Sequence, residues 1–381
     1  MLFNQIIGQE HIKNHLQTSA KNGRIPHAQL FIGKEGSGTL PMAIAYAQFL
    51  LSHFSDNPEA SELKVSKLQH PDLHFAFPVT TNDSVKKHPV SNLFLQEWRD
   101  FIKNHPYGSL FNWLRFIGVE NKQGLIGVDE ALEVVKKLQL KSYEGGFKVM
   151  IIWMAEKMNI AASNKLLKLI EEPPEKTIFL LITENEDQII NTIKSRCQAL
   201  HFPVLSEQDI ANALIQREQA SENDALKIAH QAEGNFNKAL HLLHQDSSDI
   251  VFEKWFITWI RSAFKAKGNA AVIQELVVWS ETIAKTGRET QKQFLEYCLQ
   301  FFRQALLLNY KSPDLVFLET QTPKFDLQNF APFVHSENIL AIEKEISEAM
   351  YHIERNGNAK IILLDLSMKL TRFLHKKEAK V

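Results

Sequence analysis

The chain has 381 residues, of which 44% are hydrophobic and 23% charged, and its formal net charge at neutral pH is −1. This length is typical of two or three domains, and the composition is that of a globular protein rather than a disordered one. The near-zero charge excludes a global electrostatic attraction to nucleic acid or to an anionic membrane, so any contact with DNA has to be local.

Targeting and metal signals are missing from the sequence. No apolar run approaches the roughly 18 residues of a membrane span, and the first residues lack the pattern of a signal peptide. The two cysteines, Cys197 and Cys298, show no metal-type spacing. We therefore expect buried thiols in a reducing cytoplasm and no metal site.

The first predicted helix covers residues 6–19, and a short buried strand follows at 29–32. A second helix is predicted to open at Pro41 and to run through 42–51, because proline suits the first turn of a helix. A glycine-rich turn, 33–38, separates the strand from this helix. The order strand, glycine turn and helix is typical of a loop that binds phosphates through backbone N–H groups.

This turn matches only part of the phosphate-binding template G-x-x-x-x-G-K-[ST]. Gly33 and Gly38 occupy its glycine positions, and Gly36 adds a third residue without a side chain. Thr39 and Leu40 replace the lysine and the hydroxyl residue, so the charge and the magnesium ligand are missing. Since each such contact contributes about 1.5–3 kcal/mol, Mg-nucleotide binding would weaken by roughly 10²–10⁴-fold. A nucleotide loop without its binding groups and an ordinary strand-to-helix turn both remain open at this point.

The middle of the chain alternates strands and helices. A strand is predicted at 73–79, and His70 and His74 before and within it are interpreted as structural, because Pro71 argues against a helix that could pair them on a metal. Residues 80–127 are interpreted as an insertion packed on the edge of the core. The remaining predictions are helices at 128–140, 158–170 and 186–194 and strands at 148–153, 177–183 and 198–202. This alternation predicts a parallel α/β sheet that ends near residue 203.

The last part of the sequence is predicted to be helical throughout. Short helices follow Ser206 to about residue 244, with a turn at Gly234, and residues 246–249 are interpreted as a linker. Apolar helices are then predicted at 294–309, 339–355 and 361–375. So much apolar helix suits either an internal core or packing against similar helices of other subunits.

Seven short stretches occur in a specific order: Ile7-Gly8-Gln9, Pro26-His27-Ala28, the loop 33–38, Asn164-Lys165-Leu166-Leu167-Lys168, Glu171-Glu172-Pro173-Pro174, Phe179-Leu180-Leu181 and Ser195-Arg196-Cys197. In order and spacing they resemble the AAA+ clamp-loader subunits, and within that family the delta-prime group of bacterial DNA polymerase III. The resemblance covers about residues 1–245. It implies a RecA-like AAA+ core at 1–203 with an insertion at about 80–127, a small helical lid at 204–246, and an all-α collar domain for oligomerisation at 250–381.

The chain departs from ATP-hydrolysing members of this family at three places. The loop lacks its lysine and hydroxyl residue. The strand that should end in two magnesium-binding acids is followed by Trp153 and Met154, and Asn237 stands where active members carry a phosphate-binding arginine. The zinc module of some relatives is also excluded, because no cysteine lies between residues 50 and 149. The resemblance therefore implies a subunit that does not hydrolyse ATP and holds no ATP or metal.

The chain retains the family's arginine motif, Ser195-Arg196-Cys197. The resemblance implies that Arg196, with Ser195 beside it, lies at a subunit boundary and acts in trans on ATP bound by the neighbour, as an arginine finger. Read from the residues alone, Arg196 would instead satisfy a helix end or a local carboxylate. Thr183 corresponds to the family's polar sensor, or it is only a strand cap.

The implied partners are the ATP-hydrolysing gamma/tau subunits, a delta subunit, the sliding clamp and primed DNA. The alternatives are an ATP-hydrolysing motor subunit with an atypical nucleotide site and a free-standing nucleotide-kinase-like enzyme.

Overall fold

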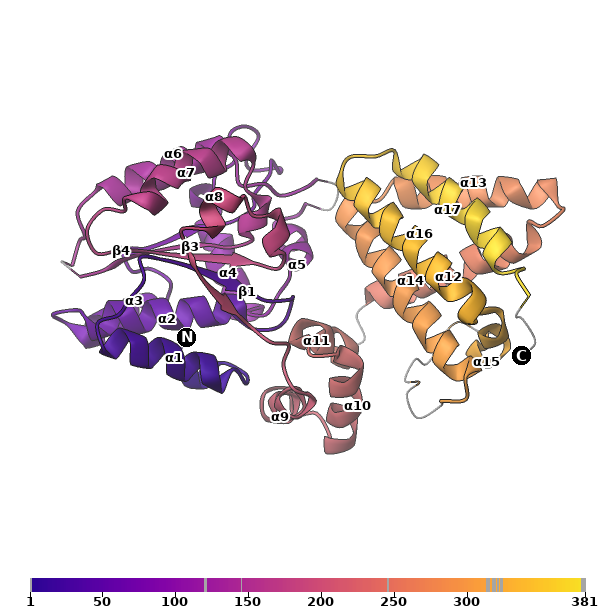
Figure 1. The fold of residues 1–381 in the computed structure, drawn as a ribbon, viewed down its shortest axis with the longest axis horizontal. Helices are drawn as coiled ribbons and strands as arrows, with labels where there is room; N and C mark the ends of the chain where they lie inside the picture. Colours follow the sequence, from indigo (N-terminus) through magenta and orange to yellow (C-terminus); the bar gives the residue numbers. More distant parts are fainter. Residues whose placement is uncertain are drawn as a thin grey trace. The chain divides into compact units, whose positions relative to one another are not determined.

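The structure is a computed structural model that describes residues 2–119, 122–144, 146–244, 247–312, 316, 320, 322 and 325–377. The chain divides into two compact units, which we describe separately (Figure 1). The first comprises Met1–Val119 and Gln123–His244, and the second comprises Glu120–Lys122 and Gln245–Val381. Within the described residues, no helix combines the length and the hydropathy that a membrane crossing requires.

A five-stranded sheet forms the centre of the first unit. Its strands are all parallel and lie in the order β2-β3-β4-β1-β5. The predicted parallel α/β core is therefore confirmed, and the predicted strand 177–183 coincides with β4. The strands are β1 (Ala28–Ile32), β2 (Leu73–Ala76), β3 (Lys148–Ile152), β4 (Thr177–Thr183) and β5 (Gln198–His201).

Helices cover both faces of this sheet (Figure 1). One face carries α1 (Glu10–Lys21), α2 (Thr39–His53) and α3 (Pro58–Ser66), and the other carries α6 (Val128–Gln139) and α7 (Ile160–Glu171). Successive strand residues alternate between two hydrophobic clusters, as the period of two requires: Leu30 belongs to the cluster with α6 and α7, and Phe31 to the cluster with α1 and α2.

The helix α2 begins two residues earlier than predicted. Thr39 and Leu40 are helical, and Pro41 is the third residue of the first turn. Because the first N–H groups of a helix need no intrahelical partner, proline is tolerated there without opening the helix. This places both residues that replace the template's lysine and hydroxyl inside a buried helical turn.

The insertion at 80–127 contains η2 (Ser91–Phe94), α4 (Leu95–Asn104) and α5 (Leu110–Phe116). Its aromatic side chains join the hydrophobic cluster on one face of the sheet. The Trp98 ring is stacked on Phe77 at 4.1 Å between centroids, and Trp153 packs on Trp98 at 5.1 Å. The Trp113 Nε1–H donates to the carbonyl of Pro78 at 2.8 Å. The insertion is therefore anchored by large buried rings.

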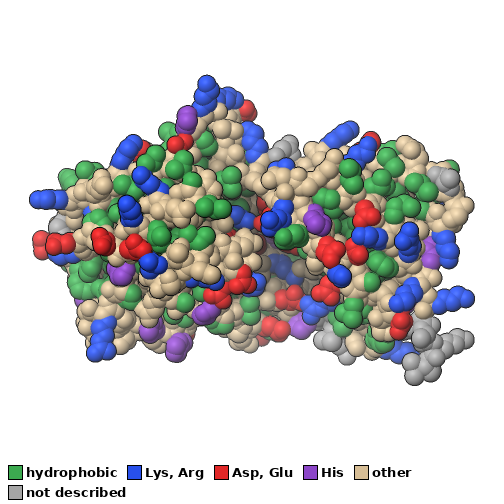
Figure 2. Space-filling view, turned by 45° about the horizontal axis from the view of Figure 1, so that its top comes forward, with side chains coloured by type: hydrophobic (Ala, Val, Ile, Leu, Met, Phe, Trp, Pro, Cys, Tyr) green, Lys and Arg blue, Asp and Glu red, His purple; other side chains and the backbone are tan. Residues whose placement is uncertain are grey.

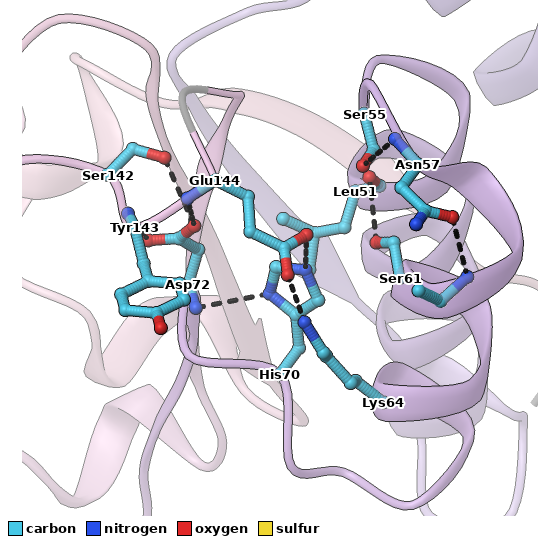
Figure 3. A network of polar contacts seen from close by, with 11 residues as sticks. Leu51, Ser55, Asn57, Ser61, Lys64, His70, Asp72, Ser142, Tyr143 and Glu144 are labelled. Atoms are coloured by element: carbon cyan, nitrogen blue, oxygen red, sulfur yellow. Dashed lines mark hydrogen bonds and ion pairs between the residues drawn. The ribbon is translucent and has the colours of Figure 1, made fainter.

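A polar network lies before the amino end of β2 (Figure 3). The Asp72 N–H donates to His70 Nδ1 at 3.1 Å, so Nε2 is the nitrogen that donates to Glu144, 3.0 Å away. Glu144 also pairs with Lys64 of α3. The Asp72 carboxylate accepts from Ser142 Oγ at 3.0 Å. His70 thus joins α3, β2 and the loop before β3, which is the structural role expected from the sequence.

Three helices follow β5 within the first unit: α9 (Glu207–Glu218), α10 (Glu222–Ala232) and α11 (Phe236–His244). Ser206 caps α9 by accepting the N–H of Asp209 at 3.1 Å. Shorter elements complete the unit: η1 (Phe3–Gln5), η3 (Ala155–Lys157), η4 (Glu186–Gln188) and α8 (Asn191–Lys194).

All the regular elements among the described residues of the second unit are helices. Its core is aromatic: Trp259 stacks on Trp279 at 5.0 Å, and the Trp259 Nε1–H donates to Ser367 Oγ at 2.8 Å. The predicted linker at 246–249 is wrong for 247–249, which open α12, because Ser and Asp suit the first turn of a helix. Asp246 lies outside the described residues. The helices are α12 (Ser247–Lys265), α13 (Ala270–Ala284), α14 (Arg288–Asn309), α15 (Leu327–Phe330), η6 (Ala331–Phe333), α16 (Ser336–Glu354) and α17 (Ala359–Phe373).

Acidic and basic side chains are interspersed on the face shown in Figure 2. This agrees with the near-zero net charge of the chain.

Candidate functional site

The glycine loop is in direct contact with the helices that follow the sheet. The N–H of Phe236, the first residue of α11, donates to the carbonyl of Gly36 at 3.3 Å. A Cβ added at Gly36 would lie 2.0 Å from Asn235 Oδ1 and 2.7 Å from the Phe236 nitrogen. Gly36 also has a φ of +71°, which other residues adopt with strain. Protein atoms therefore occupy the space beside the loop, and a glycine is needed there for that reason.

An acidic side chain of the loop strengthens this contact. Glu35 Oε1 accepts from Asn237 Nδ2 at 2.8 Å and from Asn235 Nδ2 at 3.3 Å. Asn237 occupies the position at which ATP-hydrolysing members of the resembled family carry a phosphate-binding arginine. The same Nδ2 also donates to Asn112 Oδ1 of α5, 2.9 Å away. Glu35 thus places a negative charge beside this contact, and it would repel a nucleotide's phosphates.

The insertion supplies a second contact to the loop through Tyr107. A Cβ added at Gly38 would lie 3.2 Å from the Tyr107 ring, and that ring packs edge-on against Phe236 with centroids 5.1 Å apart. The Tyr107 hydroxyl oxygen accepts from the N–H of Ile7 at 2.8 Å. Burial raises the pKa of Tyr107, so it remains a neutral phenol. One side chain thereby joins the N-terminal segment, the loop and α11.

Gln9 of the Ile7-Gly8-Gln9 stretch fixes the other side of the loop. Its Nε2 donates to the carbonyl of Ser37 at 3.0 Å and to the carbonyl of Pro203 at 2.7 Å. Pro203 lies in the connection from β5 to α9. The loop is therefore held from three directions by Gln9, Tyr107 and the turn before α11.

The loop is also tight within itself. A Cβ at Gly33 would lie 2.7 Å from both Ser37 Oγ and Thr39 Cγ2. Thr39 and Leu40 are buried, with 8% and 3% of their surfaces exposed. The three glycines and Thr39 that the sequence singled out are thus brought together, but they form a closed turn.

The position of the family's magnesium-binding acids is apolar in this structure. Trp153 and Met154 are both 4% exposed and belong to the hydrophobic cluster of the insertion. The acid that follows them is Glu156, whose Oε1 accepts from the N–H of Glu184 at 3.2 Å. Burial raises the pKa of Glu156, which favours a neutral carboxyl and disfavours a metal ligand. Among the described residues, no group of three or more His, Cys, Asp or Glu side chains could hold a metal ion.

Thr183 ends β4 and is fully buried. Its hydroxyl donates to the carbonyl of Asn185 at 3.1 Å and accepts that residue's N–H at 3.2 Å. This is the geometry of a strand cap, which was one of the two roles expected for it.

Arg196 follows α8 and is held through both ends of its guanidinium. Nη1 donates to the carbonyl of Thr192 at 2.8 Å and to Ser195 Oγ at 3.2 Å. Nη2 forms an ion pair with Glu171 Oε1 at 2.5 Å, and 37% of the Arg196 side chain is exposed. Cys197 packs on the α7 side of the sheet, where burial raises the pKa of its thiol to about 11. This half-buried side chain anchors the backbone from which the arginine extends.

The sheet register separates Arg196 from the glycine loop. Arg196 precedes β5, whose first residue, Gln198, pairs with Gln29 of β1. The loop follows Ile32, the last residue of β1. Four strand residues alone span roughly 13 Å, so the arginine and the loop lie at opposite edges of the sheet. Arg196 therefore does not serve its own chain's loop.

Several of these residues were not found from the sequence. Glu35, Tyr107 and Asn112 contact partners from about 100 to more than 200 positions away in the chain. Tyr107 and Asn112 belong to no periodic pattern or motif, and Glu35 occupies a position that the loop template leaves open. Glu171 was part of a motif, but the spacing of that motif gave no sign that it pairs with Arg196.

Comparison with known proteins agrees with the motif order. The family model of the DNA polymerase III, delta subunit matches residues 8–206. The delta' subunit of Bacillus subtilis (strain 168) DNA polymerase III is 30% identical over 214 residues, which are 55% of this chain and 52% of that protein. The tau subunit from the same organism is 29% identical over 248 residues, 64% of this chain and 37% of that protein. The alignment thus spans about half or less of the length of these relatives.

Among solved structures, a gamma subunit-related DNA polymerase III protein from Thermotoga maritima is 15% identical, with a TM-score of 0.37, and the match covers 94% of this chain and 99% of that one.

The residues matched by the family model, 8–206, are more than half of the chain and include the sheet, the glycine loop and the arginine motif. The chain therefore belongs to the DNA polymerase III delta subunit family, within the group of clamp-loader subunits that includes delta', tau and gamma.

Proposed function

We propose that this chain is a delta-prime-like clamp-loader subunit that does not hydrolyse ATP, and that it acts as a scaffold and as the donor of an arginine to a neighbouring subunit. The observation that carries this proposal is the direct contact between Gly36 and the turn at Asn235–Phe236. In a nucleotide-binding loop the backbone N–H groups must face an anion. Here Asn235 and Phe236 take up the approach to Gly36.

The charges around the loop support the same proposal. Glu35 accepts hydrogen bonds from Asn235 of the turn and Asn237 of α11, and Thr39 and Leu40 supply no positive charge. Trp153 and Met154 supply no magnesium ligand. Without the lysine of the template and without magnesium ligands, a nucleotide would have to overcome repulsion by Glu35 and separate α11 from the loop.

Arg196 is suited to act on a neighbour. It is partly exposed, and it lies at the edge of the sheet opposite its own loop. A guanidinium can bind the γ-phosphate as negative charge develops during hydrolysis, and arginine fingers contribute about 10³–10⁵ in rate. In the proposed assembly the neighbours are tau/gamma ATPase subunits and a delta subunit, the second unit forms the collar, and the complex loads the sliding clamp on primed DNA in the cytoplasm.

A second candidate is an ATP-hydrolysing motor subunit with an atypical nucleotide site. The 29% identity to a tau subunit favours it. This function would require α11 to move off Gly36 and some other group to supply the missing positive charge.

The test is Arg196→Ala in the complex reconstituted with its ATPase and delta subunits, with Lys194→Ala, at the end of the preceding helix α8, as the control. We expect DNA-stimulated ATP hydrolysis at the neighbouring site to fall about 10³-fold or more, leaving only the rate of the remaining sites. Lys194→Ala should leave the rate unchanged. Equal rates for Arg196→Ala and the parent complex would refute the trans role.

A further inference from the structure

Three motifs of the sequence meet at one place in the first unit. The Pro26-His27-Ala28 stretch contributes His27, whose Nε2 lies 3.1 Å from the carbonyl of Ile170 in the last turn of α7. The next residue, Glu171, ends that helix, and Pro173 and Pro174 prevent its continuation. Glu171 is thereby placed beside Arg196, with 2.5 Å between Oε1 and Nη2. The proposed function gives no role to this carboxylate.

The contacts of Arg196 show what its guanidinium can still offer. The two N–H bonds of Nη1 are directed at the carbonyl of Thr192 and the hydroxyl of Ser195. Glu171 Oε1 lies 2.5 Å from Nη2 as an ion pair and occupies one side of that nitrogen. A phosphate is bound best through two parallel N–H groups of one edge, and the edge that includes Nη2 is the one partly taken by Glu171. A phosphate that approaches this edge must displace the carboxylate.

The negative charge of Glu171 also opposes the binding of a phosphate to Arg196. A carboxylate within 2.5 Å of the guanidinium cancels most of its attraction for an anion, and it also repels the anion itself. Both side chains are about one-third exposed, so solvent limits the strength of the pair. The pair is strong enough to define a resting position of Arg196 and weak enough to be broken by a nucleotide.

We propose that Glu171 is a positioning residue that holds Arg196 in a resting state and is displaced when the arginine engages the phosphate of the neighbouring subunit's nucleotide. This inference rests on the proposed trans role of Arg196 and adds its regulation. The arginine would then be fully available only when a nucleotide is present at the boundary to compete for it.

The experiment compares Glu171→Gln with Glu172→Gln in the reconstituted complex and measures kcat/KM for ATP at the neighbouring site. Glutamine keeps the size of residue 171 and removes its charge. Glu172 is the adjacent exposed acid, for which no ion pair occurs among the described residues. We expect Glu171→Gln to raise kcat/KM about two- to fivefold, the factor that corresponds to an exposed ion pair, while Glu172→Gln leaves it unchanged. The gain should shrink at high salt.

A second pair of variants separates this role from a structural one. On an Arg196→Ala background, Glu171→Gln should have no effect on kcat/KM, because there is no arginine to release. A fall in kcat/KM with Glu171→Gln, equality with Glu172→Gln, or the same gain without Arg196 would each overturn the proposal. If Arg196→Ala itself does not slow hydrolysis, the trans role and this inference fail together. If it does slow hydrolysis and Glu171→Gln matches Glu172→Gln, only this inference fails.

Discussion

Replacing Gly36 by alanine tests directly whether α11 closes the glycine loop. The new Cβ would lie 2.0 Å from Asn235 Oδ1 and 2.7 Å from the nitrogen of Phe236, and one of these neighbours is backbone. The residue would also keep a φ of +71°. Gly23→Ala is the matched control, because Gly23 has a φ of +68° and nothing within 4 Å of the added Cβ.

The two substitutions differ only in the overlap with the turn before α11. A non-glycine residue in the left-handed region costs roughly 1–2 kcal/mol in both cases. Overpacking a closed contact costs about 1–3 kcal/mol more, and only Gly36→Ala should show this increment. With a urea dependence of about 3 kcal/mol per molar, typical of larger proteins, the increment lowers the unfolding midpoint of the first unit by about 0.3–1 M relative to Gly23→Ala.

The assay is urea unfolding followed by tryptophan fluorescence, with the transition of the first unit reported by Trp98, Trp113 and Trp153. A double variant with Asn235→Ala should be less destabilised than the sum of the two single variants, since the first overlapping atom has been removed. Equal midpoints for Gly36→Ala and Gly23→Ala would mean that the loop is open in solution, and the proposed scaffold role would lose its main support.

Three further substitutions test other parts of the structure. Burial raises the pKa of Glu130 of α6, so the stability of the first unit should fall as pH rises from the unfolded-state pKa of this carboxyl towards its raised folded-state pKa. Glutamine cannot ionise, so Glu130→Gln should gain stability relative to the parent between pH 4 and pH 7. Urea unfolding of both proteins at the two pH values measures this difference. A loss relative to the parent would contradict this. Trp153→Asp should destabilise the first unit by about 3–5 kcal/mol or more, as measured by thermal unfolding, because it buries a carboxylate in an apolar cluster. Calorimetry with Mg²⁺ should show no binding to this variant. A stable variant that binds Mg²⁺ would show that only the acid was missing. Tyr107→Phe leaves the buried N–H of Ile7 without its acceptor and should cost about 1–3 kcal/mol in the same urea assay, and an unchanged midpoint would argue against this contact.

The regular elements of the first unit could be predicted because their signals are local. The strand β4 is a run of buried residues that follows Pro173-Pro174, and its bounds were predicted without error. The start of α2 was placed too late, because proline is acceptable at several positions of the first turn and the pattern does not choose among them. The beginning of α12 was predicted to be a linker, because serine and aspartate are common both in linkers and in the first turn of a helix.

The site could be predicted only where a motif carries it. The glycines of the loop and Arg196 stand in motifs, and the structure places each of them in the expected element. The contacts that close the loop join residues from distant parts of the chain, such as Glu35 with Asn237 and Ile7 with Tyr107. Such pairs depend on how the loop, the insertion and α11 pack in the folded unit, and no periodic pattern in a single sequence reveals that packing.

The central claim is that the glycine loop of this chain does not bind nucleotide. The most direct measurement is a calorimetric titration of the full chain with Mg-ATP. We predict no heat of binding up to millimolar nucleotide, because Asn235 and Phe236 fill the approach to Gly36 and the template's lysine is replaced by Thr39. Binding at micromolar concentration that Gly38→Val abolishes would contradict the account and make the ATP-hydrolysing motor subunit the better description.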